Sequence, residues 1–160
     1  MAVYLVRHAH AGARRSNPHD RYRQLSEKGW RRAEVITELL SDVDVDEVLS
    51  SPATRCVQTV QGVANRHDLE VIEDDDLWED ADTRDVMTVL DRAVDGKASR
   101  TVVVCSHGNL IPVIVEQLAD QGAKVKGRGC EKGSVWVLDH DGKRFTACTY
   151  ISKTVEMLFD

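Results

Sequence analysis

The chain has 160 residues, of which 42% are hydrophobic and 30% are charged, and its formal net charge at pH 7 is −6. These values are typical of one globular domain spanning residues 1–160. No apolar run approaches the roughly 20 residues needed to cross a bilayer, and the negative charge disfavours broad binding to nucleic acid. The first residues lack the pattern of a secretory signal, so we expect a cytoplasmic protein without a membrane or nucleic-acid partner.

Short apolar runs alternate with segments of helical periodicity along the chain. Residues 3–6 predict a buried strand that ends at Arg7 and His8, and residues 9–24 predict an arginine-rich loop. The later elements are a helix at 26–40, a strand at 45–50, a helix at 52–65, a strand at 69–72, a helix at 85–94, a strand at 101–105, a helix at 109–119 and strands at 134–139 and 145–150. Asp141 and Gly142 predict a hairpin turn between the last two strands.

The first two helices have distinct start signals. Ser26 is the expected N-cap of the first helix, and Gly29 is its one position of low helix propensity. Its predicted apolar face consists of Trp30, Ala33, Ile36, Leu39 and Leu40. In the second helix, Ser51 is the expected N-cap and Pro52 the first helical residue, which places Arg55 in the opening turn near the positive end of the helix dipole.

This alternation predicts an α/β fold, a three-layer sandwich with a mostly parallel central sheet and a C-terminal β-hairpin. Sheets of this type bind ligands at the carboxyl ends of their strands. His8 follows the first strand and His107 follows the strand at 101–105, so we expect both imidazoles at that edge. The four cysteines form no C-x-x-C pair and predict reduced core thiols.

Residues around the two histidines have the properties that phosphoryl transfer needs: a nucleophile, cationic donors for the phosphate oxygens and an acid for the leaving group. His8 becomes a good nucleophile if one ring nitrogen is tied to a backbone carbonyl. Arg7 and Arg55 supply guanidinium groups, and His107 can donate a further hydrogen bond. Because these arginines would crowd a metal ion with positive charge, His8-x-His10 predicts no metal site.

Four segments then occur in an order that is specific to one family. They are Leu5-Val6-Arg7-His8-Ala9, Arg23-Gln24-Leu25-Ser26-Glu27-Lys28-Gly29, Ser50-Ser51-Pro52-Ala53-Thr54-Arg55-Cys56-Val57-Gln58-Thr59 and Ser106-His107-Gly108. Through them the chain resembles the histidine phosphatase superfamily, which has the phosphoglycerate-mutase-like fold, over nearly its whole length. Its short length and its Arg-His-Ala-His-Ala-Gly opening are similar to SixA-type phosphohistidine phosphatases. It also resembles the histidine phosphatase domain that follows a Nudix domain in some MutT-type proteins.

The resemblance implies that His8 becomes phosphorylated while Arg7, Arg55 and His107 hold the phosphate. Arg23 matches a further phosphate-contacting arginine of the small members, the alternative being an exposed loop arginine. The resemblance implies neither a cofactor nor a metal.

A carboxylate in the region of residues 77–80 matches the general acid of many members of the family. Glu79 is the expected acid in preference to Asp80. The alternative is that Glu79 belongs to a solvated acidic face with Asp74, Asp75 and Asp76.

The implied activity is hydrolysis of a phosphoric monoester or phosphoramidate. A phosphohistidine-carrying protein is the expected substrate, because so short a chain leaves little sequence for a lid. A nucleotide di- or triphosphate, or another small phosphorylated metabolite, is the first alternative, and a non-catalytic phosphate-sensing or protein-binding module is the second. The basic residues Lys124, Lys126, Arg128 and Lys132 predict a second phosphate site, a contact for an acidic protein face, or a mobile loop.

Overall fold

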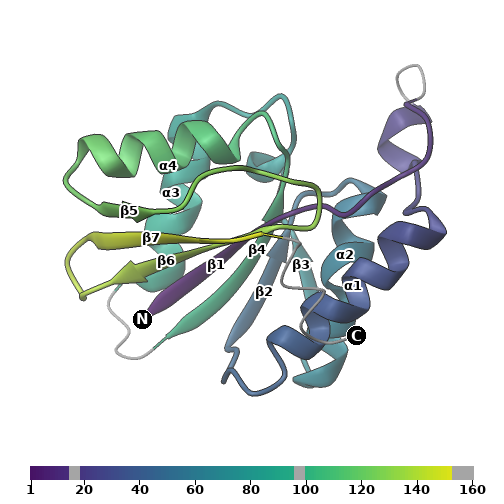
Figure 1. Cartoon of the computed structure of the whole chain (residues 1–160), viewed down its shortest axis with the longest axis horizontal. Coiled ribbons are helices and arrows are strands. Elements are labelled where there is room, and N and C mark those ends of the chain that lie inside the picture. Colours follow the sequence, from purple (N-terminus) through teal and green to yellow (C-terminus); the bar gives the residue numbers. More distant parts are fainter. Residues whose placement is uncertain (15–18, 96–99, 153–160) are drawn as a thin grey trace.

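A computed structural model describes residues 1–14, 19–95 and 100–152, and in them one sheet lies between two helical layers (Figure 1). The strands are β1 (Ala2–Arg7), β2 (Glu47–Ser50), β3 (Val71–Glu73), β4 (Thr101–Ser106), β5 (Lys124–Lys126), β6 (Val135–His140) and β7 (Phe145–Ile151). The α-helices are α1 (Glu27–Leu39), α2 (Thr54–Arg66), α3 (Thr83–Val94) and α4 (Ile111–Asp120), and η1 (His19–Tyr22) and η2 (Asp75–Leu77) are short 3-10 helices. Arg15 and Pro18 of the predicted loop lie outside the described residues.

The sheet has the strand order β3-β2-β4-β1-β6-β7-β5. The first four strands in this order are parallel to one another, and β6 runs antiparallel to β1. β6 and β7 form the predicted C-terminal hairpin, and β5 adds a parallel edge strand to β7. The predicted three-layer α/β fold with a mostly parallel sheet is confirmed.

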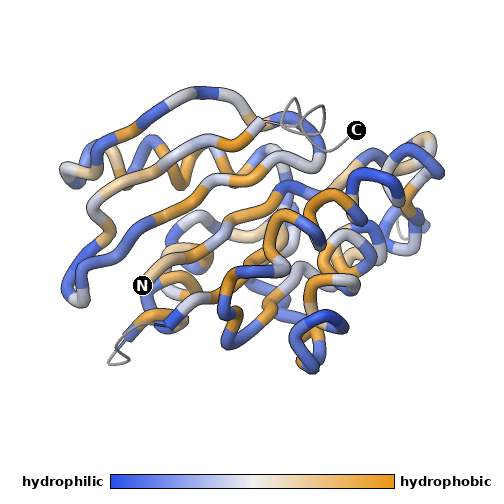
Figure 2. Tube along the Cα trace, turned by 60° about the horizontal axis from the view of Figure 1, so that its bottom comes forward, coloured by the Kyte–Doolittle hydropathy of each residue, from blue (hydrophilic) through white to orange (hydrophobic). Residues whose placement is uncertain are grey.

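The hydrophobic core lies on both faces of the sheet. Val102 and Val104 of β4 belong to the core shared with α3 and α4, whereas Val103 and Cys105 belong to the core shared with α1 and α2. A strand covered on both faces has no polar side, which explains the uninterrupted apolar run of β4. Hydrophobic residues accordingly follow the central strands in Figure 2.

The buried face of α1 differs from the predicted one at its start. Trp30 is 42% exposed, and the position that packs inward is Gly29, where an added Cβ would lie 2.0 Å from the carbonyl oxygen of His10. Arg32 is also buried, and its Nε donates a hydrogen bond to the carbonyl oxygen of Gly133. The predicted N-cap is confirmed, since Ser26 Oγ accepts from the backbone N–H of Gly29.

The start of α2 was predicted two residues too early. Its N-cap is Ala53, which has no capping side chain, so Ser51 is not the N-cap and Pro52 is not helical. The hydroxyl of Ser51 bonds a histidine instead, as described below. Arg55 still lies in the first turn, as predicted.

The predicted basic stretch, Lys124 to Lys132, contains an edge strand that the sequence did not predict. Lys124 and Lys126 lie in β5, which is exposed throughout and therefore has no periodic burial signal in its sequence. Beyond β5, the chain packs against the hairpin: Trp136 Nε1 donates to the carbonyl oxygen of Gly129, and the Tyr150 hydroxyl accepts from the backbone N–H of Glu131. These contacts hold the segment between β5 and β6 beside the carboxyl end of β1.

Two further features bear on the sequence-based expectations. Within the described ranges, none of the helices is both long enough and apolar enough to span a membrane. All four cysteines are free thiols, and Cys56, Cys105 and Cys148 are buried while Cys130 is partly buried.

Replacing Gly29 with alanine separates helix propensity from packing. Propensity alone predicts a gain of about 1 kcal/mol in the free energy of unfolding. The clash with the His10 carbonyl predicts a net loss of about 1–3 kcal/mol, because backbone on both sides must move. Urea denaturation measures the sign. Gly12→Ala is the control, since an added Cβ there meets nothing within 4 Å; an increase in stability for Gly29→Ala would contradict the packing argument.

Candidate functional site

The register of two neighbouring strands brings the two histidines together. β1 and β4 are parallel, with Arg7 paired to Ser106 at their carboxyl ends. The next residues, His8 and His107, therefore leave the sheet side by side, and the backbone N–H of His8 donates to the carbonyl oxygen of Ser106. Their ring centroids are 5.4 Å apart. The sequence-based expectation that both imidazoles meet at one edge of the sheet agrees with this geometry.

His8 is held as a neutral imidazole of defined tautomer. Its Nδ1 lies 2.9 Å from the carbonyl oxygen of Ala9. Because a carbonyl can only accept, Nδ1 carries the proton and Nε2 keeps its lone pair. Burial lowers the pKa of His8 to about 3, and the neighbouring His107, Arg55 and Arg7 act in the same direction. The ring is therefore neutral at neutral pH, with Nε2 unprotonated, as a nucleophile must be.

His107 is oriented by a serine hydroxyl. Its Nε2 lies 2.8 Å from Ser51 Oγ, and that oxygen also accepts from the backbone N–H of Ala53. This arrangement suits donation from the Ser51 hydroxyl to Nε2, which leaves the proton of His107 on Nδ1. Nδ1 is buried and has no hydrogen-bond partner among the described residues. His107 can therefore present an N–H to an anion beside His8.

Arg7 lies close to the backbone that follows β4. An added Cβ at Gly108 would be 2.5 Å from the Arg7 guanidinium carbon, so only glycine leaves room for that side chain. One guanidinium nitrogen of Arg7 donates to the carbonyl oxygen of Cys130, in the segment between β5 and β6. The space left by the missing side chain of Gly108 is thus occupied by Arg7, an arginine of the site.

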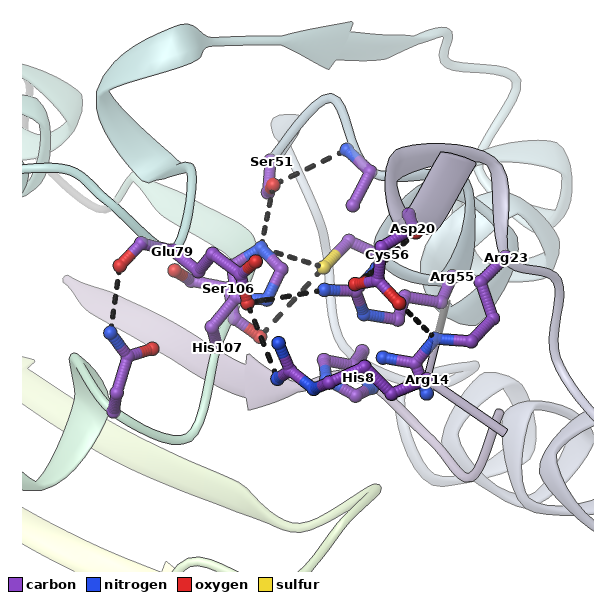
Figure 3. Close-up of polar contacts among 12 residues, drawn as sticks. His8, Arg14, Asp20, Arg23, Ser51, Arg55, Cys56, Glu79, Ser106 and His107 are labelled. Atoms are coloured by element: carbon purple, nitrogen blue, oxygen red, sulfur yellow. Dashed lines mark hydrogen bonds and ion pairs between the residues drawn. The ribbon is translucent and has the colours of Figure 1, made fainter. Parts of the chain in front are cut away.

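Arg55 is fully buried and is surrounded by opposite charge (Figure 3). One terminal nitrogen is 3.3 Å from Glu79 Oε2, and the other is 3.6 Å from Asp20 Oδ2. The guanidinium also lies 5.9 Å from the ring centre of Trp78. Burial lowers the pKa of Arg55, while Asp20 and Glu79 oppose that effect. Both carboxylates are therefore needed to keep this charge inside the protein.

Glu79 lies at the site, and Asp80 does not. The Glu79 side chain is 20% exposed, and its Oε2 is 4.0 Å from Nδ1 of His107 and 3.8 Å from a terminal nitrogen of Arg14. The Asn109 side chain donates to the Glu79 backbone carbonyl, which fixes the loop. Asp80 is exposed. The alternative of a solvated acidic face therefore does not describe Glu79.

Arg23 completes the site and contacts Asp20, a residue that was not anticipated from the sequence. The Arg23 side chain is only 11% exposed, so it is not the exposed loop arginine of the alternative reading. Its Nε is 3.0 Å from Asp20 Oδ1, and a terminal nitrogen donates to the carbonyl oxygen of Gly12. The only sequence signal for Asp20 is its position three residues before Arg23, and that spacing is too common to identify a site residue.

A pocket of about 460 Å³ opens beside His8. Its cationic lining includes Arg7, Arg14, Arg23 and Lys132. Lys132 is the member of the predicted basic stretch that reaches this pocket. Within the described part of the chain, no cluster of three or more His, Cys, Asp or Glu side chains could hold a metal ion.

Comparison with known proteins identifies the family. Residues 3–84, which include Arg7, His8, Arg55 and Glu79, match the model of the histidine phosphatase superfamily (branch 1). The chain belongs to this superfamily. A relative in Mycolicibacterium smegmatis, an 8-oxo-(d)GTP phosphatase, is 30% identical over 155 residues, which are 94% of this chain and 48% of the relative. The chain thus spans about half the length of that relative.

Several solved structures share the fold. The SixA protein of Agrobacterium tumefaciens has a TM-score of 0.73 and 24% identity, covering 94% of this chain and 97% of its own. A protein histidine phosphatase SixA complexed with tungstate has a TM-score of 0.73 and 22% identity, with 95% of each chain covered. A mycobacterial glucosyl-3-phosphoglycerate phosphatase has a TM-score of 0.69 and 16% identity, covering 94% of this chain and 97% of its own. At these identities the likeness concerns the fold.

Ser51→Ala tests the orientation of His107. Loss of one buried hydrogen bond, about 0.5–1.5 kcal/mol, predicts a fall of about two- to tenfold in kcat/KM for an aryl phosphate. Ser50→Ala is the matched control, because the Ser50 hydroxyl is also buried but donates only to the backbone carbonyl of Ser51. Equal activity losses in the two variants at equal folded fraction would show that the hydroxyl of Ser51 does not act through His107.

Proposed function

We propose that this phosphatase works without metal, through a phosphohistidine intermediate on His8. The observation that carries the proposal is the hydrogen bond from His8 Nδ1 to the Ala9 carbonyl, which leaves the Nε2 lone pair for attack on phosphorus. Buried N–H groups without partners among the described residues surround this ring: Nε of Arg7, Nε of Arg55 and Nδ1 of His107. An unpaired buried donor is costly, so a bound phosphate that accepts from these groups would be stabilised.

The proposed reaction has two steps. In the first, His8 Nε2 forms a bond to phosphorus while the bond to the leaving group breaks, and the protonated Glu79 carboxyl gives its proton to that leaving group. In the second, water attacks phosphorus, Glu79 accepts a proton from the water, and the P–Nε2 bond breaks to release phosphate and neutral His8. Arg7, Arg23, Arg55 and His107 stabilise the charge on the phosphoryl oxygens in both steps.

The first candidate substrate is phosphohistidine on a carrier protein. The SixA structures of similar fold are histidine phosphatases by name. An imidazole leaves more readily than an alkoxide once its second nitrogen is protonated, so this substrate demands less of Glu79. The pocket beside His8 is lined by residues 10–14 and Arg23, and we infer that a protein-borne side chain enters there.

The second candidate is a nucleoside di- or triphosphate, and a specific observation favours it. Arg14 and Lys132 line the pocket in addition to Arg7 and Arg23. In the proposed reaction Arg7, Arg23 and Arg55 bind the transferred phosphoryl group, so these further cations suit a second phosphate on the leaving group. The relative in Mycolicibacterium smegmatis is a phosphatase of 8-oxo-(d)GTP by name.

Replacing His8 with alanine tests the intermediate. After rapid mixing with an aryl phosphate and an alkaline quench, intact-mass spectrometry should find one base-stable, acid-labile phosphoryl group on the wild type and none on His8→Ala. Turnover of the variant should fall by at least about a thousandfold. His67→Ala is the control, because His67 bonds the Leu40 carbonyl away from the pocket. Phosphorylation of another residue would contradict the mechanism, and a wild type that neither turns over nor becomes phosphorylated would favour the phosphate-sensing module.

Replacing Lys132 with alanine separates the two substrate candidates. If nucleotides are the substrates, KM for a nucleoside diphosphate should rise about three- to tenfold, because an exposed cation on a phosphate contributes modestly. KM for a phosphorylated carrier protein should change less than twofold. Lys124→Ala, in the edge strand β5, is the charge-matched control. An unchanged nucleotide KM, together with a higher kcat/KM on the phosphocarrier, would contradict the second candidate.

A further inference from the structure

Asp20 contacts two arginines of the site at once. It lies in η1 and is 6% exposed. Its carboxylate is 3.0 Å from Nε of Arg23 and 3.6 Å from a terminal nitrogen of Arg55. Its backbone carbonyl accepts from the same nitrogen of Arg55, at 3.0 Å, and from the backbone N–H of Arg23. Figure 3 shows the carboxylate between the two guanidinium groups.

These contacts place a negative charge where two positive charges approach each other. Arg55 is fully buried, and the Arg23 side chain is 11% exposed, so water screens their repulsion poorly. The charge of Arg23 lowers the pKa of Arg55 in addition to the effect of burial, and Asp20 acts in the opposite direction. Without a carboxylate between them, the two guanidinium groups would separate or admit solvent.

Asp20 is not itself a residue of the pocket. Arg23 lines the pocket beside His8, whereas Asp20 and Arg55 are not part of its lining. A carboxylate would in any case repel a phosphate dianion. Whatever Asp20 contributes to phosphate binding must therefore pass through the arginines that it contacts.

We propose that Asp20 is a positioning residue that holds Arg23 and Arg55 together for one phosphoryl group, an inference that rests on the proposed function. The contact also joins two parts of the chain that lie far apart in sequence. Arg23 comes from the loop after β1 and is bonded to Gly12, while Arg55 comes from the first turn of α2. Asp20 fixes the distance between these two arginines. The repulsion between their like charges is therefore already offset before the substrate binds.

A double-mutant cycle tests this role. Asp20→Asn keeps the size of the side chain and one oxygen for Arg23 Nε but removes the charge. It should lower kcat/KM for an aryl phosphate about tenfold, mainly through KM, and weaken the binding of tungstate by a similar factor. In an Arg23→Ala background, where the repulsion has gone and only the ion pair with Arg55 remains to be lost, the same Asp20→Asn change should alter both quantities by about threefold or less.

The control is Glu47→Gln, which breaks a partly buried ion pair with Arg100 at the amino end of β2, away from the pocket. It should leave tungstate binding unchanged. Equal effects of Asp20→Asn with and without Arg23 would overturn the proposal, as would tungstate binding of wild-type strength in Asp20→Asn.

Tungstate binding, measured by calorimetry, does not require chemistry at His8. A wild type that binds tungstate but forms no phosphoenzyme would contradict the proposed function. The double-mutant cycle on binding would still decide the role of Asp20.

Discussion

The buried charge of Arg55 is the constraint on which the arrangement of the site depends. A guanidinium without solvent access is stable only if opposite charges and hydrogen-bond acceptors surround it. Asp20 from the loop after β1 and Glu79 from the loop after η2 supply those charges, and the Trp78 ring lies near the same group. The buried charge of Arg55 is thus compensated only when two loops converge on the first turn of α2. The same convergence places a carboxylate and several cations within reach of His8.

Strand pairing determines where this convergence occurs. Four adjacent parallel strands, β3, β2, β4 and β1, release their loops at one edge of the sheet. In that order the segments after the strands carry Glu79, then Ser51 and Arg55, then His107, then His8. The strands β2, β4 and β1 are anchored by an apolar core on both faces, so the polar groups at their ends sit on a rigid support. A phosphoryl group held here would meet donors whose positions are already fixed.

The segment between β5 and β6 closes the other side of the pocket. Its backbone accepts from Arg7 and Arg32, and it is held against the hairpin through Trp136 and Tyr150. Lys132 reaches the pocket from this segment, so residues near the C-terminal end of the chain contribute to a site built mainly from the first half. Substitutions in this segment would change which leaving groups the pocket accommodates without disturbing the groups around His8.

The sequence by itself determined the α/β alternation, the apolar strand β4 and the arrival of His8 and His107 at strand ends, because these follow from local periodicity and from chain order. It could also identify Arg7, Arg55, Arg23 and Glu79 as candidates through the family motifs. Only the tertiary structure decided that Gly29 packs on the His10 carbonyl, that Ser51 bonds His107 rather than capping α2, and that Asp20 joins Arg23 to Arg55. The reason is physical: each of these residues acts through a contact with a segment distant along the chain, and no local pattern encodes which buried charge or ring a short polar side chain will meet.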